Sequence, residues 1–230
     1  GLRYVATWPG LVIILVFALI INFVVNPAFS LMPGMVTEHF GGGALQLGWL
    51  QSVWGVGMLA GGLLLSVWGG FRRRIYTSLM GLIVAGVAIM VLGLVPGNVF
   101  WLALVALLVA GFMNPLINGP FFAILQATVE PGMQGRVFTL VQSLSAAMMP
   151  LSLMVAGPVS DAIGVQTWYL FGGATFALMG IVAFLVPAAM KLEDGRPEAA
   201  ESQQVPAGSQ SVPEESQLAP EAADVALAGE

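Results

Sequence analysis

Long apolar stretches alternate along most of this chain with short segments that contain proline, glycine and charged residues. A transmembrane helix needs about 20 consecutive, mostly apolar residues. The stretches that meet this requirement predict six membrane spans, at residues 8–32, 44–68, 75–95, 99–127, 137–159 and 166–190. We therefore expect an all-α membrane protein in which residues 1–190 form one six-helix bundle.

Breaker residues mark the connections between these spans. Pro33–Gly43 is expected to join the first two spans, and Pro96–Asn98 predicts a tight turn between the third and the fourth. Glu130–Arg136 is expected to join the fourth span to the fifth, and Asp161–Gly164 to join the last two.

The charged residues give the direction of each span. Three consecutive arginines, Arg72–Arg74, lie between the second and third spans, and each charge in hydrocarbon costs roughly 2.5–3.5 kcal/mol. This connection must therefore be aqueous, and positively charged connections normally face the cytoplasm. Six spans place all basic residues on that side: Arg3, Arg72, Arg73, Arg74, Arg136, Lys191 and Arg196. We expect a plasma-membrane (inner-membrane) protein with both termini in the cytoplasm.

Composition changes sharply after the last span. Charged residues make up 8% of the whole chain, against about 25% in soluble domains. Residues 191–230 are rich in Glu, Gln, Ser, Pro and Ala, so we expect an acidic, disordered tail, a solvated end more readily than a docking segment. The net charge of −5 belongs to that tail, and no basic patch suggests a nucleic-acid partner.

Candidate chemistry for an enzyme is sparse. The chain has no cysteine and a single histidine, His39, which we interpret as a bystander in an outer connection. No cluster of ligands suggests a metal site and no P-loop lysine suggests a nucleotide, so we expect no catalytic residues and no cofactor.

Amide side chains inside the spans are the candidate binding groups. They are Asn22, Asn26, Gln51, Asn114, Asn118 and Gln126. Because amides are unfavourable in lipid, we expect the first and fourth spans to line a polar cavity and the third and sixth to face lipid. The alternative is that these amides only hold helices together. Phe23, Trp54 and Phe122 are expected to supply apolar contacts to a bound molecule.

Two further patterns concern the arrangement of the helices. Asn22 and Asn26 precede Pro27, and Asn114 and Asn118 are interleaved with prolines in the fourth span, three spans later. Interrupted helices at matching places are typical of the inverted repeats of secondary transporters, so we predict a three-plus-three repeat. Gly57 and Gly61, four residues apart, predict a close approach of the second span to a neighbour.

Several segments resemble the major facilitator superfamily. Gly62-x3-Ser66-x2-Gly69-Gly70-Phe71-Arg72-Arg73-Arg74 resembles the loop signature of that family, although Ser66 stands where an aspartate is usual. Gln134–Phe138 and Ala156–Asp161 resemble the start and end of helix eleven in its macrolide-efflux and enterobactin-exporter branch. Asn114-Pro115 through Leu125-Gln126 resembles the tenth helix there, and the likeness covers residues 10–190.

This resemblance implies the C-terminal half, spans seven to twelve, of an exporter of small amphipathic molecules that works by alternating access. It implies partners: a small-molecule substrate, the lipid bilayer, and a missing N-terminal six-helix half or a second copy. It also implies cytoplasmic gate loops formed by Ser66, Gly69, Gly70, Arg72, Arg73, Arg74, Gly135 and Arg136. The alternative function is a six-span oligomeric channel or structural membrane protein.

Overall fold

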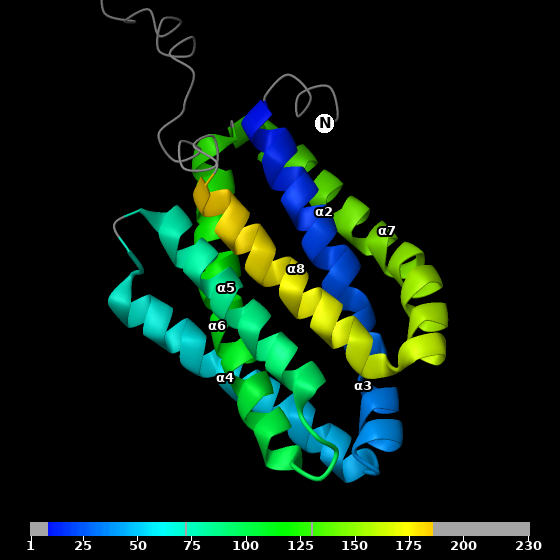
Figure 1. The fold of residues 1–230 in the computed structure, drawn as a ribbon. Coiled ribbons are helices and arrows are strands. Elements are labelled where there is room, and N and C mark those ends of the chain that lie inside the picture. Colours follow the sequence, from blue (N-terminus) through cyan, green and yellow to red (C-terminus); the bar gives the residue numbers. More distant parts are fainter. Residues whose placement is uncertain (1–8, 72, 130, 186–230) are drawn as a thin grey trace, which may run out of the picture. The chain divides into compact units, whose positions relative to one another are not determined.

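The computed structural model describes residues 9–71, 73–129 and 131–185, and these residues form a bundle of helices (Figure 1). The elements are α2 (Pro9–Ser30), α3 (Met32–Gly34), the π-helical turn η1 (Met35–His39), α4 (Ala44–Trp68), α5 (Arg74–Leu94), α6 (Phe100–Thr128), α7 (Pro131–Ile163) and α8 (Val165–Leu185). Within this part of the chain, five helices are long and apolar enough to cross a membrane. A sixth span results if the bent pair α2 and α3–η1 is counted as one.

The first span expected over residues 8–32 is helix α2, Pro9–Ser30, but the chain stays helical beyond it. The helix breaks at Leu31, and Met32–His39 continues at an angle of 43° to Leu15–Ser30. Pro33 lies in the first turn of α3, and proline cannot donate a backbone hydrogen bond to the preceding turn. The segment expected to be a loop from Pro33 is therefore helical as far as His39, and only Phe40–Gly43 separates it from α4.

The connection expected over Glu130–Arg136 is also shorter than predicted. Helix α7 begins at Pro131, so Gly135 and Arg136 lie within its first turns. Proline is favoured at the first helical position, because its missing N–H has no intrahelical partner there. At the other end of the sequence, residues 186–190 of the expected sixth span and the expected tail, residues 191–230, lie outside the described residues.

Helices α5 and α8 form the centre of the described bundle. They pack along each other, and the other extensive contacts pair α4 with α6, α5 with α6, α2 with α7, α7 with α8 and α2 with α8 (Figure 1). Glycine permits the central contact, because a side chain at Gly86 would overlap Gly173 and Ala177 of α8. In the reverse direction, a side chain at Gly173 would overlap Met90 of α5.

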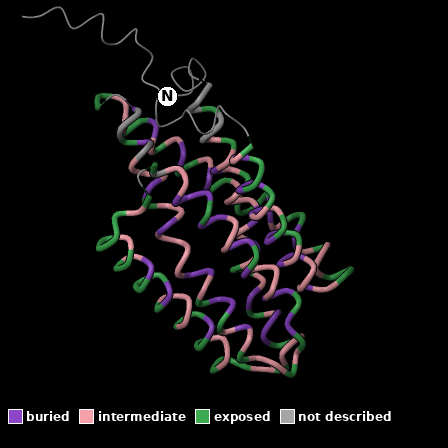
Figure 2. The backbone as a smooth tube through the Cα atoms, turned by 60° about the vertical axis from the view of Figure 1, so that its left-hand side comes forward, coloured by how far each residue is buried: buried purple, intermediate pink, exposed green. Residues whose placement is uncertain are grey.

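The expectation that the third and sixth spans simply face lipid was therefore too simple. In the most apolar segment of each helix, 56% of α5 and 44% of α8 are buried inside the bundle. The corresponding buried shares are 17% for α4 and 22% for α7. Met80 and Val87 of α5 and Leu178 of α8 still face outward, so each of these helices buries one face and exposes another. Figure 2 shows the buried positions along the faces where helices meet. The positions of Asn and Gln in the sequence identified the polar helices, but they did not identify the helices that pack most tightly.

The connections gather at two opposite ends, which we name the His39 end and the Arg73 end. Since α4 has 25 residues and an α-helix rises 1.5 Å per residue, α4 is about 37 Å long and separates Gly43 at one end from Gly69 at the other. At the His39 end, the His39 ring contacts the carbonyl of Val95 and the side chain of Gln166. At the Arg73 end, Tyr76 of α5 stacks on Phe184 of α8.

Two glycines shape the turn at the Arg73 end. Gly69 and Gly70 have φ angles of 74° and 81°, in the left-handed region that favours glycine. The N–H of Gly69 donates to the carbonyl of Leu65 and so closes α4. The N–H of Phe71 then donates to the hydroxyl of Thr77 at 2.9 Å, which ties the turn to α5.

Candidate functional site: an amide-lined cavity

A cavity of about 190 Å³ lies between α2 and α6. Its walls also include Trp54 of α4, Ala85 and Ile89 of α5, and residues of α8. We call it the amide cavity, because three side-chain amides line it: Asn22, Asn114 and Asn118. No residue with a charged side chain lines it, so binding there rests on hydrogen bonds and apolar contact.

The hydrogen bonds of these amides fix their positions on the two helices. The Nδ2 group of Asn22 donates to the carbonyl of Ala18 at 2.8 Å and to the Ser145 hydroxyl of α7 at 3.2 Å. The Nδ2 group of Asn118 donates to the backbone carbonyl of Asn114 at 3.1 Å. Both arrangements use the amide N–H groups on protein oxygens, so each Oδ1 atom can accept a hydrogen bond from a bound molecule.

Aromatic side chains from α8 supply much of the apolar wall. Trp168 and Phe176 line the cavity and are buried, with 3% and 5% of their surfaces exposed. The indole N–H of Trp168 donates to the carbonyl of Val24 at 3.1 Å, and the hydroxyl of Tyr169 donates to the carbonyl of Ala28 at 2.6 Å. Because these groups bond to α2, α8 holds α2 in place beside the cavity.

The other residues expected in the cavity lie elsewhere. Asn26 is half-buried on α2 outside the lining, and its backbone carbonyl accepts a hydrogen bond from Ser30. Gln51 is exposed on α4, and Gln126 is exposed near the end of α6. Of the expected aromatic contacts, only Trp54 lines the cavity.

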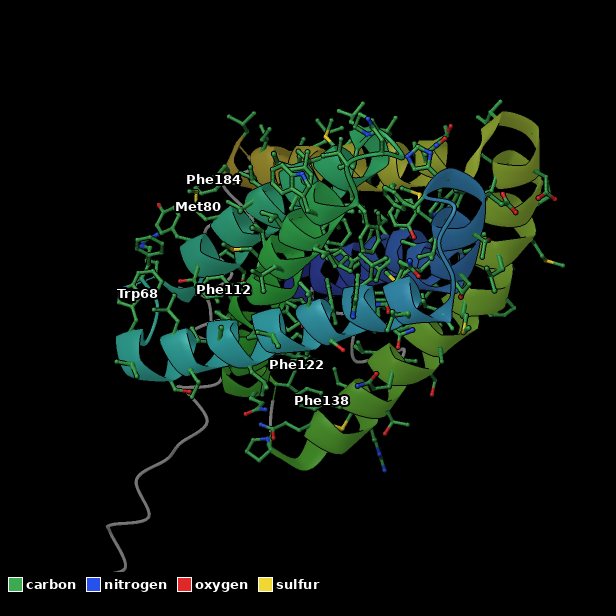
Figure 3. All side chains as sticks on the ribbon, turned by 90° about the horizontal axis from the view of Figure 1, so that it is seen from below. Trp68, Met80, Phe112, Phe122, Phe138 and Phe184 are labelled. Carbon is green, nitrogen blue, oxygen red and sulfur yellow. The ribbon has the colours of Figure 1, made fainter. Side chains whose placement is uncertain are left out.

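The two remaining aromatic residues pack between helices. Phe23 lies against Trp168, with ring centroids 6.4 Å apart. Phe122 of α6 lies beside Phe138 of α7 at 6.1 Å (Figure 3).

The described residues that were expected to form gate loops lie in the segments at the Arg73 end, but several of them are helical. Ser66 lies in the last turn of α4, where its hydroxyl donates to the carbonyl of Gly62 at 2.9 Å. Gly135 and Arg136 lie in α7 rather than in a loop, because that helix begins at Pro131. Gly69 and Gly70 form the turn after α4, and Arg73 is exposed at its end. Arg72 and the side chain of Arg74 lie outside the described part of the chain.

Sequence reasoning missed several residues that shape the site. Ser145 of α7 was not among the expected site residues, although it receives the hydrogen bond of Asn22. Gln134, known from the motif, donates to the carbonyls of Gln126 and Val129 and so closes the end of α6. Tyr169 gave no signal in the sequence, because a single aromatic residue near the start of an apolar span is common.

Metal chemistry finds no support in the residues that the structure describes. No group of three or more His, Cys, Asp or Glu side chains there could hold a metal ion. The arrangement is suited to reversible binding of an uncharged or amphipathic molecule.

Comparison with known proteins identifies the family of this chain. Residues 8–222 match the family model of the Major Facilitator Superfamily. The chain belongs to the Major Facilitator Superfamily. With five or six candidate spans, it is a multi-pass membrane protein.

Curated members of the Major Facilitator Superfamily are similar to this chain over one half of their length. Macrolide efflux protein A of Streptococcus pyogenes is 29% identical over 193 residues, which cover 84% of this chain and 48% of that protein. Multidrug efflux pump Tap of Mycolicibacterium fortuitum is 30% identical over 194 residues, 84% of this chain and 46% of that protein. The chain thus spans about half the length of the curated relatives it matches. No solved structure matches.

These relatives bear on the earlier predictions. The resemblance to the major facilitator superfamily and its macrolide-efflux branch is confirmed. The relatives are named as efflux proteins and not as enzymes, so the prediction of a non-enzymatic chain is confirmed at the level of the family.

Proposed function

We propose that this chain is the C-terminal half of a secondary transporter that exports small amphipathic molecules by alternating access. The amide cavity between α2 and α6 is the observation that carries the proposal, because it offers amide oxygens and aromatic rings without a fixed charge. Such a lining suits a large, partly apolar molecule better than a compact ion. The relatives named as macrolide and multidrug efflux proteins support this substrate class.

Most of the extensive helix pairings support the three-plus-three repeat, whereas the α7–α8 contact has no counterpart of similar extent between α4 and α5. An exchange of α2 with α6, α4 with α7, and α5 with α8 turns the α4–α6 contact into the α7–α2 contact. The same exchange turns the α5–α6 contact into the α8–α2 contact and leaves the α5–α8 contact unchanged. Inverted repeats of this kind place the substrate site where the repeats meet, which is where Asn22 and Asn114 face the cavity.

The size of the cavity and the exposure of two helices support a second half. Sites for drug-sized molecules usually have volumes of about 300–1,000 Å³, and the amide cavity is smaller, at about 190 Å³. Helices α4 and α7 are the least buried of the five long apolar helices, and Leu59 and Met154 are 71% and 74% exposed on them. A partner six-helix half packed on these faces would enlarge the cavity and cover the exposed residues.

The distribution of charged and aromatic residues supports an orientation in the membrane. The protein would lie in the plasma (inner) membrane with its Arg73 end facing the cytoplasm. Basic residues are confined to one side in the six-span topology, which agrees with the positive-inside rule. Aromatic side chains, which favour membrane–water interfaces, lie at both ends: Trp49 and Trp101 near the His39 end, Trp68 and Phe71 near the Arg73 end. Both termini would then lie in the cytoplasm.

Efflux measurements on the full-length protein test the proposal. Asn118→Leu and Asn22→Leu should each reduce export of a macrolide or a dye at unchanged expression. Loss of one hydrogen bond worth about 1 kcal/mol corresponds to a roughly fivefold loss of affinity. Asn26→Leu is the matched control, because Asn26 lies on the same helix outside the cavity lining. Equal export by all three variants and the unsubstituted protein would refute the assignment of the cavity.

A six-span channel or structural protein that assembles from several copies is the second candidate. The exposed faces of α4 and α7 favour it equally, since a second copy could cover them. The gene distinguishes the two: coding sequence for six further spans in frame ahead of Gly1 supports the half-transporter, and a start codon directly ahead of Gly1 supports the oligomer.

A further inference from the structure

His39 connects three segments that are distant in the sequence. Its Nε2 atom lies 2.7 Å from the carbonyl oxygen of Val95, in the connection between α5 and α6. Its Nδ1 atom faces the Nε2 amide group of Gln166, in the first turn of α8. The ring is half-buried and also packs edge-on against Phe40. We call His39, Val95 and Gln166 the outer clamp.

The outer clamp holds the far end of a bent segment. Met32–His39, which we call the bent arm, continues the first span after the 43° break at Leu31. His39 is the last residue of this arm, so its contacts fix the arm against α5 and α8. Breaks of this kind are places where a helix can change direction with little disturbance of its neighbours.

The arm also borders the amide cavity. Phe29, just before the break, and Met32, just after it, both line the cavity. The Phe29 ring meets the Trp54 ring of α4 edge-on, with centroids 4.9 Å apart, across a pair of helices that otherwise touch little. A movement of the bent arm would therefore change the access to the cavity from the His39 end.

As the side chains stand, the hydrogen bonds of the outer clamp fit a neutral imidazole. A carbonyl can only accept, so the Nε2 atom of His39 must carry a hydrogen and donate to Val95. In a neutral ring the Nδ1 atom then accepts from the amide N–H of Gln166. A proton taken up from water on the Nδ1 lone pair turns that atom into a donor, and two donors then face each other.

We propose that His39 is a proton-binding site that holds the bent arm closed when neutral and releases its contact with α8 when protonated. Protonation strengthens the bond to Val95 and breaks the one to Gln166 unless that amide turns over. The arm then remains tied to the end of α5 and loses its hydrogen bond to α8, while Met35 and Val36 keep their apolar packing in the core. Protonated histidines open other protein contacts in the same way.

The other ionisable groups at this end do not take over this role. Glu38 on η1 and Asp161 in the last turn of α7 are both exposed. The connection from Val95 to Val99, the first turn of α8 and the start of α4 bring no ionisable side chain to the ring. Among these residues only the His39 ring joins the arm to both Val95 and Gln166, so loss of the transition in His39→Gln assigns the switch to His39.

Distance measurements between spin labels test the proposal without an export assay. This chain contains no cysteine, so Thr37→Cys on the bent arm and Ile163→Cys at the end of α7 give a labelled pair. The pair is placed in the full-length protein in lipid nanodiscs, with any cysteine outside these 230 residues replaced by serine. Asn98→Cys with Ile163→Cys is the control pair, because neither position lies on the arm.

Each variant has its own expected change in distance. In the otherwise unchanged protein, the distance from the arm to α7 should lengthen on acidification between about pH 8 and pH 5, while the control distance stays constant. His39→Gln, which cannot be protonated in this range, should abolish the transition. Gln166→Glu should keep the arm closed at acidic pH, because a carboxylate accepts the new Nδ1 hydrogen.

A distance that does not change with pH, or an unchanged transition in His39→Gln, would overturn the proposal. An open arm in Gln166→Glu at acidic pH would also overturn it, because the hydrogen-bond argument requires the carboxylate to hold the arm. These results leave the proposed export function untouched, since no measurement here depends on transport.

Discussion

Individual side chains link the helices of this bundle by donating to backbone carbonyls of their neighbours. Trp168 and Tyr169 of α8 donate to Val24 and Ala28 of α2, and Ser78 of α5 donates to Ile117 of α6. A carbonyl oxygen has two lone pairs, so it can accept such a bond besides its helical one. Ala28 lies in the last turn of α2, where carbonyls begin to lose their helical partners at the break. The hydroxyl of Tyr169 therefore stabilises the bundle where the first span bends.

Tyr169→Phe tests this contact. The substitution removes only the hydroxyl and leaves the ring in place, so the carbonyl of Ala28 loses one partner. We expect the free energy of unfolding to fall by about 1 kcal/mol, measured by denaturation in mixed micelles. Tyr76→Phe is the control, because the Tyr76 ring stacks on Phe184 and no hydrogen bond of its hydroxyl is found among the described residues. Equal stability of the two variants would contradict a role for the Tyr169 hydroxyl.

At the scale of the elements, glycines decide how closely the helices approach. A side chain at Gly57 would overlap the backbone of Leu108, and one at Gly61 would overlap the backbone of Phe112. In return, Gly111 of α6 faces the backbone of Trp54. The spacing of Gly57 and Gly61 predicted this close approach, which the structure assigns to α4 and α6. Small residues are typical of such contacts, because little hydrophobic driving force remains between helices in lipid.

Gly61→Ala tests the α4–α6 contact against a neighbouring position. The added methyl group would overlap the carbonyl of Phe112, and overpacking of this kind costs about 1–3 kcal/mol. Gly62→Ala is the matched control, because nothing lies within 4 Å of a side chain there. We expect the first variant to unfold more easily and the second to be unchanged or slightly more stable. Unfolding in mixed micelles measures both, and a stable Gly61→Ala variant would contradict the close contact.

Hydropathy was sufficient to place most helices. In lipid, the backbone N–H and C=O groups of a span must bond to each other, and a helix satisfies them within the span. The helix expected over residues 44–68 runs from Ala44 to Trp68, and that expected over 75–95 runs from Arg74 to Leu94. The break at Leu31 could not be located this way, since the residues on both sides of it are apolar. The burial of α5 and α8 was also missed, because it depends on glycine contacts between helices far apart in the sequence.

The candidate site could be predicted only in part. Asn22, Asn114 and Asn118 were found because amides inside apolar spans are rare and need polar or protein surroundings. Gln51 and Gln126 have the same side chain but lie on exposed positions, and the sequence does not reveal the rotation of a helix about its axis. Interpreting His39 as a bystander was incomplete, because its contacts come from segments 56 and 127 residues away.

At the scale of the whole molecule, the ends of the helices alternate between two sides. The His39 end collects η1, the connection between α5 and α6, and the start of α8. The Arg73 end collects the connection between α4 and α5, with Tyr76 stacked on Phe184. This alternation agrees with basic residues on one side only, so the polarity of the bundle can be measured directly.

Single cysteines at the two ends test this polarity. Asn98→Cys and Ile163→Cys, both exposed at the His39 end, should react with a membrane-impermeant maleimide in intact cells. Gly69→Cys at the other end is strained by its positive φ, so Ser66→Cys in the neighbouring helical turn is the better choice there. Ser66→Cys should react only after the cells are permeabilised. Labelling of Ser66→Cys in intact cells would reverse the proposed orientation.

Protection of one cavity position by substrate is the most direct test of the account. Ala28→Cys places a thiol in the lining of the amide cavity, and Asn98→Cys serves as a control outside it. In the full-length protein, a macrolide or dye that the cells export should slow the reaction of Ala28→Cys with maleimide and leave Asn98→Cys unaffected. An unchanged reaction rate at Ala28→Cys with saturating, exported substrate would contradict binding between α2 and α6.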